Sequence, residues 1–475
     1  MRADEVAGLG KLAGAALSGG TKRIAEFHTG IAERVFYQLQ RRMGPAAAPA
    51  RVVHDGIAGG TYAVVRTSLD AGARAAGMAA AGQARDDGSL ADHPNGRVIL
   101  GVLNGAHGDL LDREISELSL PMSLRFGGRD AAVEPAALSV AYPDATARLA
   151  VLLHGLVETA DAWRYHAARH HGDPTVTYGT LLQRDLGYTP VWVRYNTGLR
   201  ISDNGRELSA LLDRLVAAWP TPVQDMVLIG HSMGGLVARR ALAQAGDSSA
   251  AGDRHWPGLV RDTITLGTPH LGAPLEQGVN AAVHLLDRFG ETRWLARQLA
   301  ARSVGIKDLR YGNVVEADWV GRDPDASGNY CTDVPLHAGA RHFVVVAALA
   351  GSPDSPMGDL VGDLLVRPKS ASGDTSDHRR LPLPAEHIHR LSGLHHLDLL
   401  NHPQVYAQMH SWLVNRPEGN GTDSAFPTDR RAGSAAGHQR RSSRRRSEPV
   451  LAMTGGSGCA APGGVRCESM DNCQG

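Results

Sequence analysis

Apolar runs of strand length alternate with amphipathic segments of helical length over residues 137–416, and this alternation constrains the fold most strongly. The runs are apolar at consecutive positions, which is typical of strands buried on both faces of a parallel sheet. Between two of them, residues 204–219 carry leucines at helical spacing. The pattern predicts an α/β domain with a mainly parallel central sheet flanked by helices, and a site at the carboxyl ends of the strands. The predicted strands are 147–155, 189–196, 225–232, 260–270 and 340–349.

Residues 1–136 indicate a helical amino-terminal region instead, which we interpret as a cap or an interaction module. A second helix is expected over residues 57–78, beyond a break rich in proline and alanine. The first helix is indicated by apolar residues at three- and four-residue spacing, namely Ile24, Phe27, Ile31 and Val35.

Two further segments depart from the alternation. Residues 274–339 fall between two predicted strands and lack strand-like patterning, so we expect a lid-like insertion there. Residues 417–475 are rich in serine, glycine and arginine, which predicts a disordered basic tail. Three of the four cysteines lie in that tail at spacings that fit no zinc site, and Cys331 is interpreted as a structural or surface thiol.

The overall charge and hydropathy exclude several classes of partner. The formal net charge is zero, so no nucleic-acid partner is expected. No apolar run reaches the length of about 18 residues that a membrane-spanning helix needs. The first residues lack the basic-then-apolar order of a secretory signal, so we expect a cytoplasmic protein, with peripheral contact to a membrane or lipid interface as a further option.

Ser232 is the candidate nucleophile. A Gly-x-Ser-x-Gly match arises by chance roughly 0.4 times in a chain of this composition, so its context decides. An apolar strand precedes Ser232 and a helix follows, which is the setting of a nucleophile elbow. Gly230 and Gly234 are expected where a side chain would collide across the tight turn. The backbone N–H groups of Met233 and Leu156 are the candidate oxyanion donors.

A serine nucleophile also needs a base and an acid that orients the base, in the chain order serine, acid, histidine. Asp363 lies past the end of a predicted strand and is preferred to Asp359 and Asp374. His396 lies in the loop before the last helix and is preferred to its neighbour His395. In this interpretation Asp363 holds the imidazole of His396, which takes the proton from the serine.

The ordered motifs "LLHGL", "GHSMGGLVAR", "TLGTPHLGAPLEQ", "GDLLVRPKSASG" and "HHLDLLNHPQVYAQMHSWL" carry a family resemblance. Over residues 147–412 the chain resembles the α/β-hydrolase lipase/esterase group that includes bacterial triacylglycerol lipases and GPI-inositol-deacylase-like proteins. In that group the acid opens an Asp-Gly-Leu-Val motif, which aligns with Asp363, and the base opens a His-Leu-Asp motif, which aligns with His396. Leu364 stands where the family has glycine, and the oxyanion loop has fewer glycines than in many members.

The resemblance implies hydrolysis of carboxylic esters, often of lipids. No cluster of metal ligands stands out in the sequence, so neither a cofactor nor a metal ion is expected. The leading hypothesis is therefore a serine hydrolase that acts on an acyl ester or lipid through an acyl-enzyme on Ser232. An acyltransferase with the same three residues is an alternative within the enzymes. A non-catalytic binding or scaffold protein, in which the helical amino-terminal region acts, is the alternative from another class.

Overall fold

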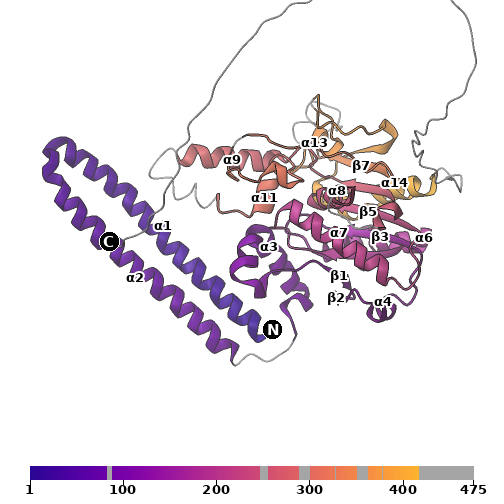
Figure 1. Ribbon diagram of the computed structural model, residues 1–475, viewed down its shortest axis with the longest axis horizontal. Coiled ribbons are helices and arrows are strands. Elements are labelled where there is room, and N and C mark those ends of the chain that lie inside the picture. The colour runs from indigo at the N-terminus through magenta and orange to yellow at the C-terminus, as the bar shows by residue number, and fades with distance from the viewer. Residues whose placement is uncertain are drawn as a thin grey trace, which may run out of the picture. The chain divides into compact units, whose positions relative to one another are not determined.

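The computed structural model has an eight-stranded sheet at its centre, with the strand order β2-β1-β4-β3-β5-β6-β7-β8. The strands β3 to β8 run parallel, whereas β1 pairs antiparallel with both β2 and β4. This order, with helices on both faces, is the α/β-hydrolase fold that the sequence predicts (Figure 1). The structure describes residues 1–82, 88–246, 255–287, 300–326, 328–349, 362–376 and 378–416. The strands are β1 (Ser123–Phe126), β2 (Arg129–Ala131), β3 (Arg148–Leu153), β4 (Thr189–Arg194), β5 (Asp225–His231), β6 (Val260–Leu266), β7 (Arg341–Ala348) and β8 (Ile388–Ser392).

The two faces of the sheet carry separate apolar cores, because successive side chains of a strand point to opposite faces. Val151 of β3 packs in a cluster with residues of α7 and α8, whereas Leu152 packs with residues of α6 and α14. The described helices are α1 (Ala3–Met43), α2 (Ala48–Ala81), α3 (Pro94–Glu114), α4 (Pro135–Ala141), α5 (Ala167–His171), α6 (Tyr178–Leu186), α7 (Ile201–Ala218), α8 (Met233–Gly246), α9 (Pro274–Asp287), α11 (Val304–Asp308), α13 (Pro368–Ser372) and α14 (Pro403–Val414).

Each of the five apolar runs contains one strand, β3 to β7, and the leucine-rich segment forms α7, so these predictions are confirmed. The strands β1 and β2 lie before residue 137, in the region that was expected to be helical, and that expectation is wrong there. These two strands are short and mostly polar, and they form the edge of the sheet, so they lack the continuous apolar pattern. The sequence pattern also misses β8, a five-residue edge strand that is only partly buried.

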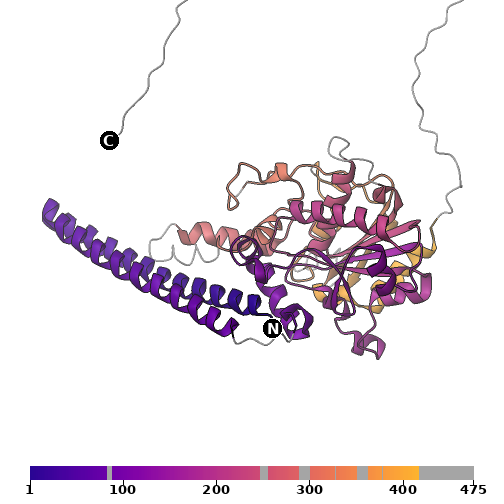
Figure 2. The same cartoon turned by 60° about the horizontal axis from the view of Figure 1, so that its bottom comes forward.

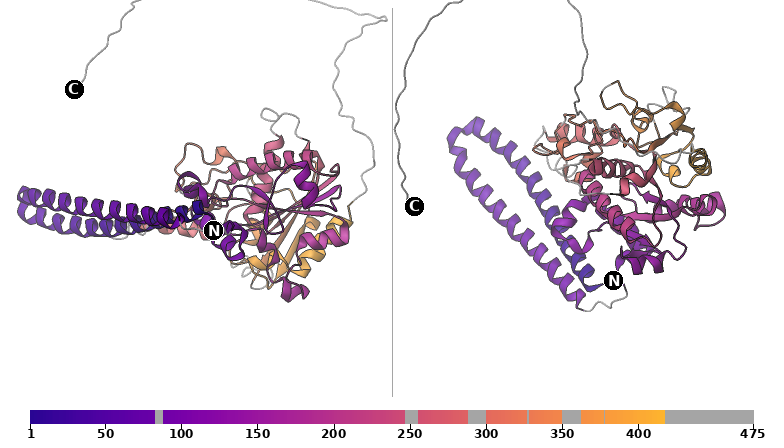
Figure 3. Two further views of the ribbon diagram at one scale, coloured as in Figure 1. Left: turned by 90° about the horizontal axis from the view of Figure 1, so that it is seen from below. Right: turned by 45° about the vertical axis from the view of Figure 1, so that its right-hand side comes forward.

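The amino-terminal helices are confirmed as α1 and α2, which are joined by a 3₁₀ turn at Gly44–Ala47. The two helices lie antiparallel and side by side (Figures 2 and 3). The first turns of α1 contact the rest of the amino-terminal region, where Lys11 Nζ lies 2.5 Å from Glu117 Oε1. No described helix has the length and apolar character that a membrane crossing requires. The predicted apolar face rests on side chains outside the described part of the structure, those of Ile24, Phe27, Ile31 and Val35.

Helix α3 packs closely against the loop that follows β3. Gly105 lies on the contacting face, and a Cβ added there would come within 2.9 Å of the Val157 Cα. The carbonyl of the same residue, Gly105, accepts a hydrogen bond from Oγ of Ser303, the N-cap of α11, at 2.6 Å. The amino-terminal region therefore supports a loop at the carboxyl edge of the sheet, where the candidate site lies.

The expected insertion does lie between two strands, β6 and β7, and its described part includes α9 and α11. A buried ion pair holds it to the domain, with Asp308 Oδ1 2.5 Å from Arg200 Nη1. Another buried pair lies within the insertion, where Glu276 Oε1 is 3.2 Å from Arg310 Nη2. Cys331 is buried and its sulfur contacts Asn313 Oδ1 at 3.0 Å, which favours the structural interpretation of this thiol. The expected basic tail, residues 417–475, lies outside the described residues.

Candidate active site

Ser232 occupies the turn between β5 and α8, at the carboxyl end of a central strand. Its φ is 51°, in the left-handed region, which costs a residue other than glycine about 1–3 kcal/mol. A Cβ added to Gly230 would overlap the Gly235 nitrogen, and one added to Gly234 would come within 2.7 Å of the His154 carbonyl oxygen. The turn that presents Ser232 thus requires glycine on both sides of the serine, because the chain approaches itself too closely for a side chain.

Asp363 and His396 lie together, in the two loops that follow β7 and β8. The Nδ1 of His396 is 2.7 Å from Asp363 Oδ2, and both side chains are almost fully buried. The other carboxylate oxygen, Oδ1, accepts hydrogen bonds from the N–H groups of Leu365 at 3.0 Å and Val366 at 2.8 Å. The backbone is joined as well, since the His396 N–H donates to the Asp363 carbonyl at 3.0 Å. These contacts fix the carboxylate and the imidazole in one relative orientation.

The imidazole of His396 lies beside the strand that carries the serine. Its ring centroid is 4.7 Å from that of His231, the residue immediately before Ser232. The His396 carbonyl is 3.2 Å from His231 Nε2, which ties the two loops together. The second ring nitrogen of His396, Nε2, is buried and has no hydrogen-bond partner among the described residues. It is the nitrogen that a general base would turn toward a nucleophile when Nδ1 is held by a carboxylate.

Electrostatics at His396 favour the protonated ring. Burial alone would lower the pKa of this imidazole, but the adjacent Asp363 carboxylate and, more weakly, Glu158 outweigh it, so the pKa lies above the ordinary value. A base with a raised pKa accepts a proton more readily, and it stabilises the imidazolium that forms when a serine loses its proton.

The alternatives weighed for the acid and the base lie elsewhere. Asp374 is more than half exposed and its carboxylate lies 3.5 Å from Arg380 Nε, while Asp359 lies outside the described residues. His395 is about one-third exposed, and its Nε2 lies 3.3 Å from Asp398 Oδ2. Among the described candidates, the structure brings together the preferred pair.

The loop after β3 lies against the serine, since a Cβ added to Gly155 would come within 2.9 Å of Ser232 Cβ. In this loop the Gly155 N–H donates to Glu158 Oε2 at 2.6 Å, and the Val157 N–H donates to Thr197 Oγ1 at 3.2 Å. The described residues provide no acceptor for the Leu156 N–H between them. Met233 is the first residue of α8, and N–H groups of a first helical turn have no acceptor within their helix. Both expected oxyanion donors therefore have an N–H without a backbone partner.

Glu158 and His231 form a buried pair that the sequence analysis did not identify. The Nδ1 of His231 is 3.0 Å from Glu158 Oε1, and the His231 ring is fully buried. Burial alone would raise the pKa of Glu158, but the His231 ring and the Gly155 N–H outweigh it and lower the pKa. The pair links the loop after β3 to the serine strand and, through the His396 carbonyl, to the base. The acidic residue three positions after Gly155 is the signal that could have suggested this contact.

His154, at the end of the same strand, has no place in proton transfer. Burial lowers its pKa to about 4, so the ring is neutral near pH 7. The ring stacks on Tyr195 with centroids 4.6 Å apart, and the Tyr195 hydroxyl donates to the His154 carbonyl at 2.6 Å. These contacts shape the loop.

The loops that carry the candidate site also carry exposed apolar residues, which we call the apolar rim. We use this name for four exposed residues of the loops that carry the oxyanion donors, the acid and the base: Val157, Leu364, Leu365 and Leu397. Leu364 also has a φ of 85° at the position where the resembling family has glycine. Exposed apolar side chains that gather around a site mark it as a contact surface for an apolar partner.

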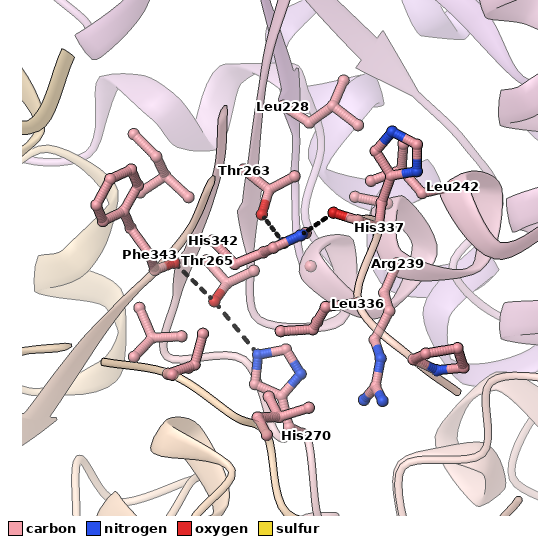
Figure 4. A pocket seen from close by; sticks show the side chains of 17 residues that line it. Leu228, Arg239, Leu242, Thr263, Thr265, His270, Leu336, His337, His342 and Phe343 are labelled. Carbon is pink, nitrogen blue, oxygen red and sulfur yellow. Dashed lines mark hydrogen bonds between the residues drawn. The ribbon is translucent and has the colours of Figure 1, made fainter. Parts of the chain in front are cut away.

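A separate cavity lies between α8 and the strands β6 and β7 (Figure 4). Thr263 Oγ1 lies 2.6 Å from His342 Nδ1 in its wall, and His270 Nε2 lies 3.3 Å from Thr265 Oγ1. Burial lowers the pKa of both histidines, so they are neutral near pH 7. In the described part of the chain, the cavity wall includes neither the serine nor the acid–base pair, so the cavity is distinct from the candidate site.

No group of three or more histidine, cysteine, aspartate or glutamate side chains is arranged to hold a metal ion within the described ranges.

Residues 150–322 match the model of the PGAP1-like alpha/beta domain family. Over 80 residues, 16% of the chain, the sequence is 31% identical to GPI inositol-deacylase A of Yarrowia lipolytica, and the match spans 7% of that protein. Among solved structures, the mature lipase BlEst2 of Bacillus licheniformis is 19% identical, with a TM-score of 0.35 over 56% of this chain and 91% of that one. Lipase 1 of Pelosinus fermentans is 12% identical, with a TM-score of 0.34 over 57% of this chain and 100% of that one.

Proposed function

Because the chain carries a PGAP1-like alpha/beta domain within an α/β-hydrolase fold, we propose that the protein is a serine hydrolase that cleaves carboxylic esters of lipids. The observation that carries this proposal is the buried Asp363–His396 pair, 2.7 Å apart, beside an elbow that holds Ser232 at a φ of 51°. A strained backbone and a buried acid–base pair both cost stability, and their coincidence at one edge of the sheet supports a catalytic use.

In the proposed reaction Ser232 Oγ attacks the ester carbonyl, and His396 Nε2 takes the hydroxyl proton. Asp363 holds the ring through Nδ1 and stabilises the imidazolium. The N–H groups of Leu156 and Met233 donate to the oxyanion of the tetrahedral intermediate, and each donor contributes roughly 3 kcal/mol in comparable sites. The imidazolium then gives its proton to the leaving alcohol. Water, activated by the same imidazole, releases the acid from the acyl-enzyme.

The apolar rim supports a lipid as the acyl donor. Burial of each exposed leucine against an acyl chain contributes about 25 cal/mol for every Å² removed from water, and that gain is absent with a short acyl group. The PGAP1-like family match and the similarity to a GPI inositol-deacylase agree with a lipid ester as the substrate class.

Hydrolysis of acyl esters by the full chain tests this proposal. The Ser232→Ala variant should lose at least about 10⁴-fold in kcat, because serine is the attacking group. Ser139→Ala is a matched control, since Ser139 is an exposed serine of α4 whose hydroxyl bonds the Pro135 carbonyl. Retention of full hydrolysis by a folded Ser232→Ala variant would rule out the proposed nucleophile.

A further inference from the structure

Four arginines line a second cavity, on the face of the sheet that α6 covers, and the proposed reaction does not use them. They are Arg97 of α3, Arg125 of β1, Arg164 of the 3₁₀ turn Ala160–Arg164, and Arg194 of β4. The cavity encloses about 570 Å³ including its open mouth. The sheet register places Arg125 opposite Trp192, two residues before Arg194, so these side chains share one face.

The arginines outnumber the carboxylates that neutralise them. Asp161 Oδ2 is 2.5 Å from Arg97 Nε, while its Oδ1 lies 3.6 Å from Arg164 Nη1. Asp130 pairs with the other two arginines, Arg125 and Arg194, and its Oδ1 lies 2.5 Å from Arg125 Nη1. Two carboxylates form ion pairs with four guanidinium groups, and a third, Asp92, acts on Arg194 through its charge, so the cluster keeps a net positive charge.

Arg194 carries the strongest indication of a ligand. It is 3% exposed, and its Nη2 donates to Asp130 Oδ2 at 2.9 Å. Its Nε and Nη1 are buried and have no hydrogen-bond partner among the described residues. Burial lowers the pKa of this guanidinium despite the opposing charge of Asp130. Buried donors without partners are rare, because each costs about 1–3 kcal/mol, so these two N–H groups point to an acceptor that the chain does not supply.

Neutral donors also surround the cavity. Thr159, Thr177 and Thr180 line it, and Thr177 is the N-cap of α6, so the positive end of that helix dipole lies at the cavity. Planar guanidinium groups from different elements, with hydroxyls between them, match a tetrahedral anion with several acceptor oxygens better than a single carboxylate.

The cavity is connected to the candidate active site by one short loop. Gly155 lies against Ser232, Leu156 is the proposed oxyanion donor, and Thr159 lines the cavity. Four residues span at most about 14 Å, so Gly155 beside the serine and Thr159 in the cavity wall are no farther apart than this.

We propose that the arginine cavity binds a phosphoryl group, and that this group belongs to the ester substrate whose carbonyl Ser232 attacks. The second part rests on the proposed function, whereas the first does not. Free phosphate and a lipid phosphate present the same chemistry to the cavity, and the experiment below separates them.

The first arm measures binding of inorganic phosphate to the full chain by titration calorimetry at constant ionic strength. We expect saturable binding by the wild type and by Ser232→Ala, and at least about tenfold weaker binding by Arg194→Gln, since a charged hydrogen bond contributes 1.5–3 kcal/mol. Arg164→Gln changes an arginine at the exposed mouth of the cavity, so it still tests phosphate binding if Arg194→Gln fails to fold. It should weaken phosphate binding by roughly threefold. Arg184→Gln is the matched control, because Arg184 is an exposed arginine of α6 paired with Asp185. Absence of saturable binding, or equal binding by all variants, would overturn the phosphoryl site.

The second arm compares two esters with the same acyl chain, one with a phosphoryl group and one without. Arg194→Gln and Arg164→Gln should raise KM for the phosphorylated ester alone, by roughly tenfold and threefold, and leave hydrolysis of the uncharged ester within about twofold. Equal effects on both esters, with phosphate binding intact, would overturn the link to the substrate and leave a site for free phosphate. If the wild type hydrolyses neither ester, the proposed function fails, while the first arm still decides whether the cavity binds phosphate.

Discussion

At the scale of single residues, the candidate site depends on how firmly Asp363 is held. Its two carboxylate oxygens have three hydrogen-bond donors in total, two from backbone and one from His396. A carboxylate held in this way keeps one tautomer of the ring, with the proton on Nδ1. The raised pKa of His396 is the measurable consequence.

Asp363→Asn should lower kcat by roughly 10⁴-fold, because the amide favours the wrong tautomer of the ring. It should also remove the charge that raises the pKa of His396. The base must be neutral to act, so hydrolysis is lost as pH falls through this pKa, and the acid limb of the pH–kcat profile should move to lower pH in the variant. An acid limb that stays in place would mean that Asp363 does not set the titration of the base.

Glu158→Gln should move the same acid limb to lower pH by a smaller amount, since Glu158 raises the pKa of His396 more weakly than Asp363 does. Glutamine keeps an acceptor for the Gly155 N–H, so the loop is retained while the charge is removed. Glu207→Gln, an exposed change of the same charge on α7, should leave the profile unaltered. A loss of kcat without any shift of the acid limb would indicate a role in packing alone.

Leu364→Gly should raise the free energy of unfolding by up to about 1 kcal/mol, because glycine adopts a φ of 85° without the steric cost that leucine bears. Leu365→Gly, at the next position, should lower it, since that residue lacks a positive φ. Urea unfolding of both variants measures the difference.

The same Leu364→Gly change should reduce hydrolysis of long-chain esters more than hydrolysis of short-chain esters. Equal effects on both would count against the apolar rim as a contact for the acyl chain.

At the scale of elements, α3 joins the amino-terminal region to the reaction site. It lies outside the PGAP1-like match at residues 150–322, yet it packs on the loop that carries Leu156. The match also ends before Asp363 and His396, so the candidate site draws on segments on both sides of the matched domain.

Gly105→Ala should displace the loop at Val157 and weaken the oxyanion donor, with a loss in kcat of about 10²-fold and little change in stability beyond the local strain. Gly72→Ala in α2 is the matched control, because a Cβ there meets open space. The control should leave kcat unchanged and raise the free energy of unfolding by up to about 1 kcal/mol. Equal kcat values for the two variants would mean that the packing of α3 does not affect the loop that carries Leu156.

At the scale of the whole molecule, the central sheet could be predicted because its strands are buried on both faces and therefore read as continuous apolar runs. The strands β1 and β2 could not, since they are short and carry polar residues such as Arg125 and Asp130, so they lack a continuous apolar run. The serine, acid and base could be proposed from strand ends and chain order. The Glu158–His231 pair and the arginine cavity could not, because each joins side chains that only the folded sheet brings together.

The most direct test of the central claim, that His396 and Asp363 activate Ser232, is to locate the residue that a fluorophosphonate probe modifies in the full chain. Such a probe reacts with a serine hydroxyl that a neighbouring base deprotonates. Peptide mapping by mass spectrometry should find one adduct, on Ser232, and His396→Ala should abolish it while Ser139→Ala leaves it intact. An adduct on another residue, or labelling of Ser232 that persists in a folded His396→Ala variant, would contradict the account.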